Sequence, residues 1–211
     1  ELIALRSGGT SIDREIFSGN VDIDKIKRNN NVDKGVEKEL DNLIKKWGHV
    51  QRPFPGNHTG EILTDIGRNK LFSLIIDKEY NGNKVSVTQL SNLLTRLSAH
   101  NPALGVMVMV PNSLGPGELL LKYGNKEQKD KYLPKLSDGS MVPCFGLTGP
   151  HNGSDALGEI DTGIVFKDSD GNLKIQVEIN KRYITLAPVA NLIGLAVNVI
   201  DPDNLLPPGV N

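Results

Sequence analysis

The sequence predicts an α+β fold in which an all-helical part comes first and an antiparallel β domain follows. Up to about Gly139, apolar residues recur at helical spacing, whereas later segments are short, rich in β-branched residues and separated by turn residues. Helices and strands thus occur in separate runs without alternating βαβ units, which excludes a Rossmann sheet. We expect an N-terminal arm over residues 1–33, a helical domain over 34–139 and a β domain over 140–211.

The first predicted helix follows the polar arm. Its apolar residues recur at helical spacing: Val36, Leu40, Leu43, Ile44 and Trp47. Gly48 is placed to end the helix, because glycine is common just after the last helical turn. We interpret Trp47 as a core-facing anchor and not as a ligand-binding residue, since a large aromatic side chain at a periodic apolar position packs in the core.

Two more helices are predicted before the middle of the chain. The segment 61–72 is helical, and Ser86 or Thr88 is placed to cap the helix after it. The apolar face of that later helix holds leucines three and four residues apart: Leu90, Leu93, Leu94 and Leu97.

The last predicted helices lie before Gly139. The segment 103–110 is almost wholly apolar, which implies a helix that is buried on all sides. The segments 114–123 and 126–136 then form a helix pair that is broken at Gly124.

Five strand-like segments follow: 142–147, 162–167, 173–179, 183–186 and 191–200. The sequence D-S-D-G-N between the second and third is a strong hairpin turn. Alternation in L-K-I-Q-V-E-I puts the apolar side chains of the third strand on one face and the polar ones on the other. This pattern predicts a half-exposed antiparallel strand.

The composition excludes several classes of protein. Hydrophobic residues make up 38% and charged residues 23%, and the net charge is −1, so nothing favours nucleic acid or an anionic membrane surface. The single cysteine, Cys144, excludes an internal disulfide and fits a reducing compartment, so we expect a cytoplasmic protein. No run approaches the roughly 18 apolar residues that span a bilayer. The four histidines lack metal-ligand spacing, so no metal site is expected.

Two segments carry most of the functional information. The first, P-C-F-G-L-T-G-P-H-N-G-S-D, begins at Pro143 and runs from a strand into a turn. Such an edge presents backbone N–H groups and hydroxyls, which a phosphate or an acceptor-rich planar heterocycle requires. The second, N-K-R-Y-I-T, begins at Asn180 and places Tyr183 two residues before Thr185, on the same side if the segment is a strand.

Both segments resemble the flavin-binding middle domain of the acyl-CoA dehydrogenase family. In that family the first motif usually reads aromatic-x-x-Thr-Glu-Pro-x-x-Gly-Ser-Asp, and the second reads Lys-x-Trp-Ile-Thr. The residues that match are Phe145, Thr148, Pro150, Gly153, Ser154 and Asp155 in the first, and Lys181, Tyr183, Ile184 and Thr185 in the second. Gly149 stands where the family commonly has Glu, and Tyr183 stands where most relatives have Trp.

Two further segments carry the same resemblance upstream. N-S-L-G at 112–115 and Y-G-N-K-E-Q-K-D-K-Y-L-P at 123–134 are similar to the helical-domain signature of the family, in the same order. Four motifs in register are far more specific than a lone glycine pattern. N-K-R-Y-I-T-L-A-P and P-N-S-L-G-P-G-E-L-L resemble in particular the large bacterial long-chain fatty-acyl-CoA dehydrogenases.

The resemblance implies an FAD cofactor. It assigns cofactor binding to Phe145, Gly146, Leu147, Thr148, Gly153, Ser154, Tyr183, Ile184 and Thr185. Thr148 would hydrogen-bond the pyrimidine end of the flavin, Tyr183 would pack on a ring face, and Thr185 would offer its hydroxyl near N5. Ser154 would bond a phosphate oxygen or the pantetheine arm of the substrate. The redox chemistry itself belongs to the flavin.

The resemblance also implies a fatty-acyl channel. The substrate residues would be Ser154, Val106, Met107, Val110 and Leu114. The helical spacing of the last four suits plain core packing equally well, so both interpretations stay open here.

The reaction that the resemblance implies is α,β-dehydrogenation of a fatty acyl-CoA to a trans-2-enoyl-CoA in β-oxidation, with electron transfer flavoprotein as the oxidant of the reduced flavin. In the family the catalytic base is a glutamate of a C-terminal helical domain, and no residue here is assigned to it. We therefore expect the chain to be a fragment, with an incomplete β domain, that is inactive alone. Relatives form dimers or tetramers, so a homo-oligomer is expected at full length, and the long-chain branch allows membrane association of the intact protein.

Two alternatives remain. Acyl-CoA oxidases and flavin-dependent oxygenases share the architecture and differ in the oxygen reactivity of the reduced flavin. A non-catalytic module that binds acyl-CoA or a partner would keep the scaffold and lack the base.

Overall fold

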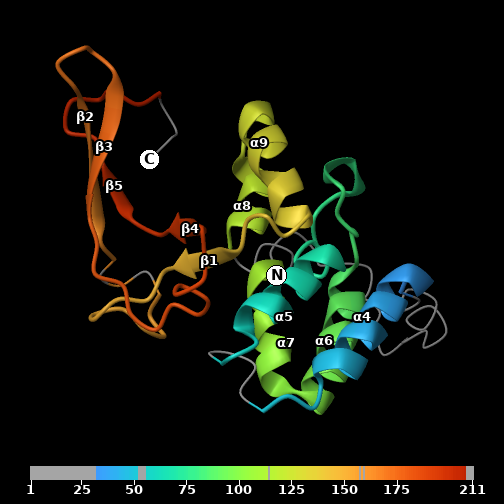
Figure 1. Cartoon of the computed structure of the whole chain (residues 1–211). Helices are drawn as coiled ribbons and strands as arrows, with labels where there is room; N and C mark the ends of the chain where they lie inside the picture. The colour runs from blue at the N-terminus through green and yellow to red at the C-terminus, as the bar shows by residue number, and fades with distance from the viewer. Residues whose placement is uncertain (1–31, 52–55, 114, 157, 159, 208–211) are drawn as a thin grey trace, which may run out of the picture.

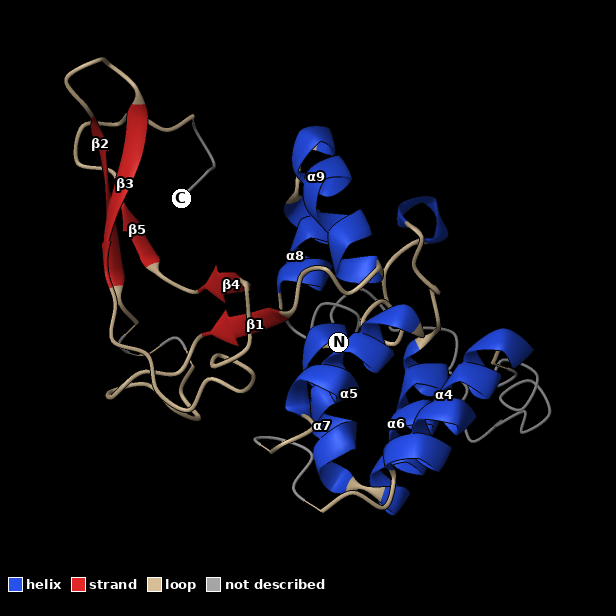
Figure 2. Ribbon diagram, viewed as in Figure 1, coloured by secondary structure: helices blue, strands red, loops and turns tan. Residues whose placement is uncertain are grey.

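A computed structural model describes residues 32–51, 56–113, 115–156, 158 and 160–207. A helical part is followed by a smaller sheet part that stands beside it (Figures 1 and 2). The helices are α4 (Lys34–Trp47), α5 (Thr59–Arg68), η1 (Lys78–Tyr80), α6 (Val87–His100), α7 (Pro102–Met109), η2 (Val110–Asn112), α8 (Pro116–Tyr123) and α9 (Lys126–Ser137). The strands are β1 (Pro143–Gly146), β2 (Thr162–Lys167), β3 (Leu173–Glu178), β4 (Leu192–Leu195) and β5 (Asn198–Ile200). The α+β order is confirmed, whereas the predicted domain boundaries stay a prediction, and the arm lies mostly outside the described residues.

Helix α4 ends where the sequence predicts, before Gly48. The Asp33 side chain accepts a hydrogen bond from the Gly35 amide, and the Gly48 amide donates to the Ile44 carbonyl at the other end. Trp47 is buried and its indole N–H donates to Asp65 of α5 at 2.7 Å. The interpretation of Trp47 as a core anchor is therefore confirmed, with α5 as its partner.

Side-chain caps also define α6 and α7. Ser86, and not Thr88, caps α6, in a capping box with Gln89. Asn101 caps α7 by accepting from the amides of Ala103 and Leu104. The pair α8 and α9 is broken at Gly124, as predicted.

The prediction that the segment 103–110 is buried on all sides is wrong. Val106 and Met109 are 39% and 42% exposed, whereas Leu104, Met107 and Val108 are fully buried. One side of α7 packs closely on α6, where Gly105 lies against Ser98. The physical reason is that a helix packed against its neighbours on one side keeps the opposite side open, whatever its composition.

The stretch Pro102–Tyr123 is long and apolar enough, by length and composition alone, to cross a membrane, with a mean hydropathy of 1.3. This finding corrects the expectation that no run approaches that length. The stretch contains α7, η2 and α8, and 53% of its most apolar window is buried inside the protein. A core helix has the same length and composition, so the observation is weak evidence for a membrane span.

The main core joins the helices to the beginning of the sheet. Leucines and isoleucines from α4, α5, α6 and α7 pack in one cluster that also includes Val142, Cys144 and Leu186. Leu186 is completely buried, although it lies in a turn 49 residues beyond Ser137, the end of the last described helix. Because burial of a leucine side chain stabilises by about 1.5–3 kcal/mol, this residue anchors its loop to the helical part.

The strands form two small sheets. β1 pairs with β4 in parallel, and β2 lies between β3 and β5, antiparallel to β3 and parallel to β5. The D-S-D-G-N hairpin is confirmed, but the other two pairings are not antiparallel as predicted. The reason is that β4 and β5 return only after the β2–β3 hairpin, so each can pair with an earlier strand in the same direction.

Two predicted strands differ in the structure. The segment 183–186 is a turn and not a strand, because Tyr183 and Leu186 have φ of 57° and 68°, outside the extended region. The segment 191–200 is divided between β4 and β5, which belong to different sheets. The pattern of apolar residues could not predict either difference, because it indicates which residues are buried and not the sign of φ or the partner of a strand.

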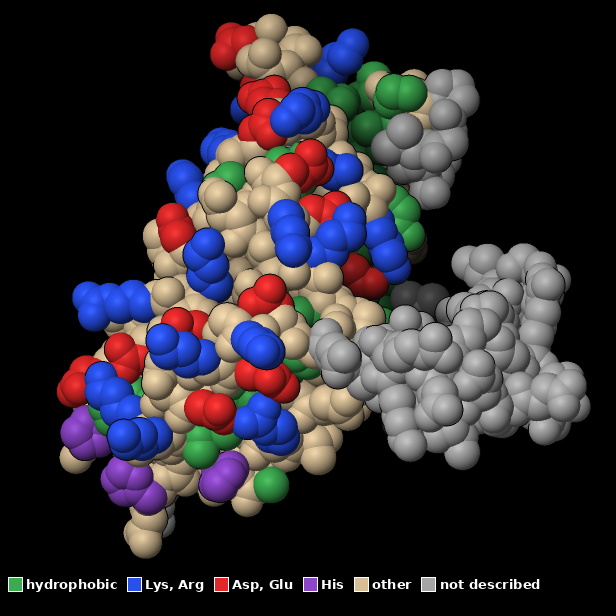
Figure 3. Space-filling model, turned by 90° about the vertical axis from the view of Figure 1, so that its right-hand side faces the viewer, with side chains coloured by type: hydrophobic (Ala, Val, Ile, Leu, Met, Phe, Trp, Pro, Cys, Tyr) green, Lys and Arg blue, Asp and Glu red, His purple; other side chains and the backbone are tan. Residues whose placement is uncertain are grey.

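Strand β3 is more exposed than predicted. Its apolar residues share a face, but Leu173, Ile175 and Val177 are 49%, 48% and 40% exposed, and every residue of the strand is exposed. On the helical part, Lys and Arg side chains are interspersed with Asp and Glu over the face shown in Figure 3.

Candidate functional site

The two motif segments lie side by side. The Arg182 amide donates to the Thr148 carbonyl at 2.9 Å, and the Lys181 ammonium donates to the Leu147 carbonyl at 3.2 Å. Both bonds join the end of β1 to the loop that follows β3 and Ile179. The fold therefore brings together residues more than 30 positions apart in the sequence, although the second segment is not a strand.

Lys181 is a buried cation at the centre of this contact. Its side chain is 8% exposed, and its ammonium lies 2.6 Å from an Asp161 carboxylate oxygen and 2.9 Å from the Ala196 carbonyl oxygen. The ammonium lowers the pKa of the Asp161 carboxyl group below its ordinary value, and the Asn180 amide assists. Sequence reasoning used Lys181 only as a motif match, because nothing in the sequence pairs it with Asp161.

Asn152 holds the turn after β1. It is 4% exposed, and its amide group donates to the carbonyls of Leu147 at 3.0 Å and Ala156 at 3.3 Å. A Cβ atom on Gly149 would lie 2.7 Å from Asn152 Oδ1 and 3.1 Å from the Asn180 carbonyl oxygen. The family's usual Glu would not fit there beside a buried Asn152, so this departure has a packing reason. Sequence reasoning saw Asn152 only as a turn residue.

Some side chains of the second motif are buried in the core, and others are exposed to solvent. Ile184 packs against the helical core and Leu186 lies inside it, whereas Tyr183 and Thr185 are exposed. Tyr183 is 88% exposed with a left-handed backbone. A bulky residue at positive φ is strained, and such strain persists where the surrounding structure enforces it, often at functional sites.

The remaining predicted cofactor residues lie along β1 and its turn. Phe145, Leu147 and Thr148 are half-buried, and Gly146 is buried beneath the stem of Lys181. Gly153 and Ser154 are exposed, with open space beside Gly153. Thr148 has no acceptor for its backbone N–H among the described residues. The edge thus offers an amide, hydroxyls and an exposed aromatic ring.

The predicted substrate residues do not share one face. Met107 is completely buried in the helical core, which favours core packing for it, whereas Val106 is exposed and Val110 is half-buried. Leu114 lies outside the described residues. Val106 and Val110 therefore remain the candidates for contact with a ligand.

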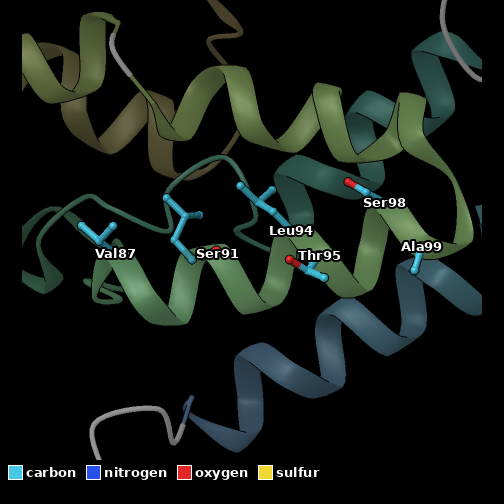
Figure 4. A pocket seen from close by; sticks show the side chains of 7 residues that line it. Val87, Ser91, Leu94, Thr95, Ser98 and Ala99 are labelled. Carbon is cyan, nitrogen blue, oxygen red and sulfur yellow. The ribbon is translucent and has the colours of Figure 1, made fainter. Parts of the chain in front are cut away.

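A sizeable groove lies away from the two motif segments. Its volume is about 670 Å³, and Figure 4 shows its lining side chains, all of which come from α6. None of the predicted site residues lines it. The groove is therefore separate from the site that the hydrogen bonds between the two motifs define.

Other chemistry finds little support in the described part of the chain. Cys144 is buried, and burial raises the pKa of its thiol, so its nucleophilic thiolate form is disfavoured. The described residues contain no group of three side chains arranged to hold a metal ion.

Comparisons with known proteins point to one family. The family model for the acyl-CoA dehydrogenase N-terminal domain matches residues 27–140. An acyl-CoA dehydrogenase of Bacillus subtilis is 31% identical over 132 residues, which are 63% of this chain and 33% of that protein. The human mitochondrial very long-chain specific acyl-CoA dehydrogenase is 39% identical over 85 residues, which are 40% of this chain and 13% of that protein.

A solved structure shows the same fold. The Bacillus anthracis acyl-CoA dehydrogenase, which was crystallised with FAD, superposes with a TM-score of 0.65 at 22% identity and covers 78% of this chain and 28% of that one. The chain spans about a third or less of the length of the curated relatives that it matches. The family model covers more than half of the residues of this chain, and the fold matches that of the solved acyl-CoA dehydrogenase structure. The chain therefore belongs to the acyl-CoA dehydrogenase family.

Proposed function

We propose that this chain supplies one wall of the FAD site of an enzyme that dehydrogenates fatty acyl-CoA to trans-2-enoyl-CoA. The observation that supports it most is the pairing of the two motif segments. In this paired region Tyr183 and Thr185 are exposed, and the Thr148 amide has no acceptor among the described residues. A planar, acceptor-rich ring needs donors along one edge and an aromatic surface for stacking.

The residues present fit such a group. Thr148 would hold the pyrimidine end with its amide and hydroxyl, Tyr183 would stack, and Thr185 would donate its hydroxyl to the ring. Ser154, on the exposed turn, would take a phosphate or the pantetheine arm. When bound, FAD supplies the hydride acceptor, and the protein supplies position and hydrogen bonds.

The substrate needs an apolar surface beside the ring. Dehydrogenation removes a proton from Cα and a hydride from Cβ of the thioester, so an apolar surface must hold the alkyl chain beside the ring. Val106 and Val110 offer such a surface on α7 and η2. Electron transfer flavoprotein as electron acceptor and a homo-oligomeric assembly belong to the same proposal.

The test uses the intact protein that carries this sequence. We expect oxidised-flavin absorbance in the purified protein, bleached without oxygen by palmitoyl-CoA, and we expect electrons to pass to electron transfer flavoprotein. Thr185→Ala should weaken FAD binding. Thr95→Ala, an equal change at an exposed position of α6, should leave it unchanged.

The outcomes separate the alternatives. Peroxide formation in air at the rate of acyl-CoA consumption would favour an oxidase. Binding of FAD and acyl-CoA with no bleaching would favour a non-catalytic module. Absence of FAD binding under all these conditions would overturn the proposal.

A further inference from the structure

The contacts of Lys181 suggest a role beyond stability. Its ammonium donates to the carbonyls of Leu147 and Ala196 and forms an ion pair with the Asp161 carboxylate, so three oxygen atoms from three segments lie against it. Lys174 offers a contrast, since it lies 3.7 Å from Asp168 but is 54% exposed. A buried ammonium costs free energy unless it is fully paired, so the site around Lys181 is built for a cation.

Lys181 acts on the peptide bond that precedes Thr148. The Leu147 carbonyl accepts from Lys181 on one side and from Asn152 on the other, at 3.2 and 3.0 Å. A trans peptide unit is planar, and its N–H points opposite to its C=O. The two donors that hold the Leu147 carbonyl therefore aim the Thr148 amide in the opposite direction, where no described group accepts it.

The stem of Lys181 contributes to the same arrangement. A Cβ atom on Gly146 would lie 3.5 Å from Lys181 Cγ, so the aliphatic part of the side chain lies across β1 at its glycine. Asp161, the residue before β2, neutralises the ammonium and accepts from the Asn180 amide. These contacts fix the position of the Lys181 stem and balance the charge of its ammonium.

We propose that Lys181 is a positioning residue for cofactor binding, which acts through the Leu147–Thr148 peptide to direct the Thr148 amide at the acceptor end of the flavin. This inference rests on the proposed function. An amide directed at the end of the ring that gains negative charge on reduction favours the reduced form. Loss of Lys181 should therefore weaken FAD binding and make the midpoint potential of the bound flavin more negative.

The experiment compares variants of the intact protein. Lys181→Met keeps the stem and removes the ammonium, and K181M/D161N also removes the carboxylate that would otherwise be left unpaired. Lys174→Met is the matched control at an exposed ion pair. We expect both Lys181 variants to raise the Kd for FAD about tenfold, equivalent to about 1.4 kcal/mol, and K174M to leave it unchanged.

The readouts distinguish positioning from simple support of the fold. A residue that only supports the fold would lower the unfolding temperature but leave the midpoint potential of the folded holoprotein at the parent value, and that result would overturn the inference. Parent-like FAD affinity in K181M/D161N would also overturn it.

A measurement on the parent protein tests the inference even if the variants do not fold. Hydrogen exchange at the Thr148 amide should slow when FAD is added, and exchange that FAD leaves unchanged would refute the inference. Failure of the parent itself to bind FAD would instead refute the proposed function, so the two failures are distinct.

Discussion

Asn112 provides the sharpest test of how the helical part is held together. It is 2% exposed at the end of η2, and its side chain makes hydrogen bonds at both ends. Its oxygen accepts from the Leu74 amide at 2.7 Å, and its nitrogen donates to the carbonyls of Leu71 and Val108 at 2.6 and 2.8 Å. One side chain thus satisfies three buried backbone groups of two segments.

Replacing Asn112 by Ala leaves these groups without their partner. An unsatisfied buried polar group costs about 1–3 kcal/mol, and partial relaxation reduces the sum, so we expect Asn112→Ala to lower the free energy of unfolding by about 3 kcal/mol. That is a large part of the roughly 5–15 kcal/mol that stabilises a typical domain. Asn112→Asp keeps the shape but turns the donors toward Leu71 and Val108 into acceptors, and we expect it to cost at least as much.

Urea unfolding measures the loss as a shift of the midpoint at constant slope. The control is Asn125→Ala, which removes the exposed cap of α9 and should cost only about 1 kcal/mol. If Asn112→Ala costs no more than Asn125→Ala, the assignment of Asn112 as the tie between these segments is wrong.

Three further predictions concern the sheet and the second motif. Because Lys181 lowers the pKa of Asp161, the carboxylate contributes stability that is fully present above its unfolded pKa of about 4 and is lost as pH falls through the folded pKa. The free energy of unfolding should therefore fall less steeply with acid pH in Asp161→Asn than in the parent protein. An unchanged pH profile of the unfolding free energy would contradict the pairing. Leu186→Ala should cost about 2–5 kcal/mol in thermal or urea unfolding because the side chain is fully buried, whereas Leu173→Ala, at a half-exposed position, should cost far less. Tyr183→Gly should leave the free energy of unfolding unchanged or raise it by up to about 1 kcal/mol, because glycine relieves the strain of a positive φ. Its affinity for FAD should fall. A clear loss of stability would show that Tyr183 is not strained.

Much of the helical part could be predicted because its signals are local. Apolar spacing and caps at positions such as Gly48 and Ser86 act within a few residues, and these short-range terms agree with the final packing. The D-S-D-G-N hairpin belongs to the same class, since a turn and its flanking alternation lie within one short segment.

The site was predictable only in part. The motif resemblance identified the two segments that lie together, but it did not indicate the roles of Lys181 and Asn152. Lys181 acts through a carbonyl 34 positions away. Asn152 bonds carbonyls four and five positions away, and what the sequence does not indicate is that its side chain is buried in the turn. Composition records neither which polar side chain is buried nor which oxygen it meets.

The amino-acid sequence by itself determined the order of helices before strands, the helix caps and the family. Tertiary structure alone decided that the 183–186 segment turns through left-handed residues, that β4 and β5 belong to different sheets, and that α7 keeps an exposed face. The physical reason is range: periodicity and capping are set by near neighbours, whereas strand partners, the sign of φ at a bulky residue and the uncovered side of a helix depend on contacts between distant segments.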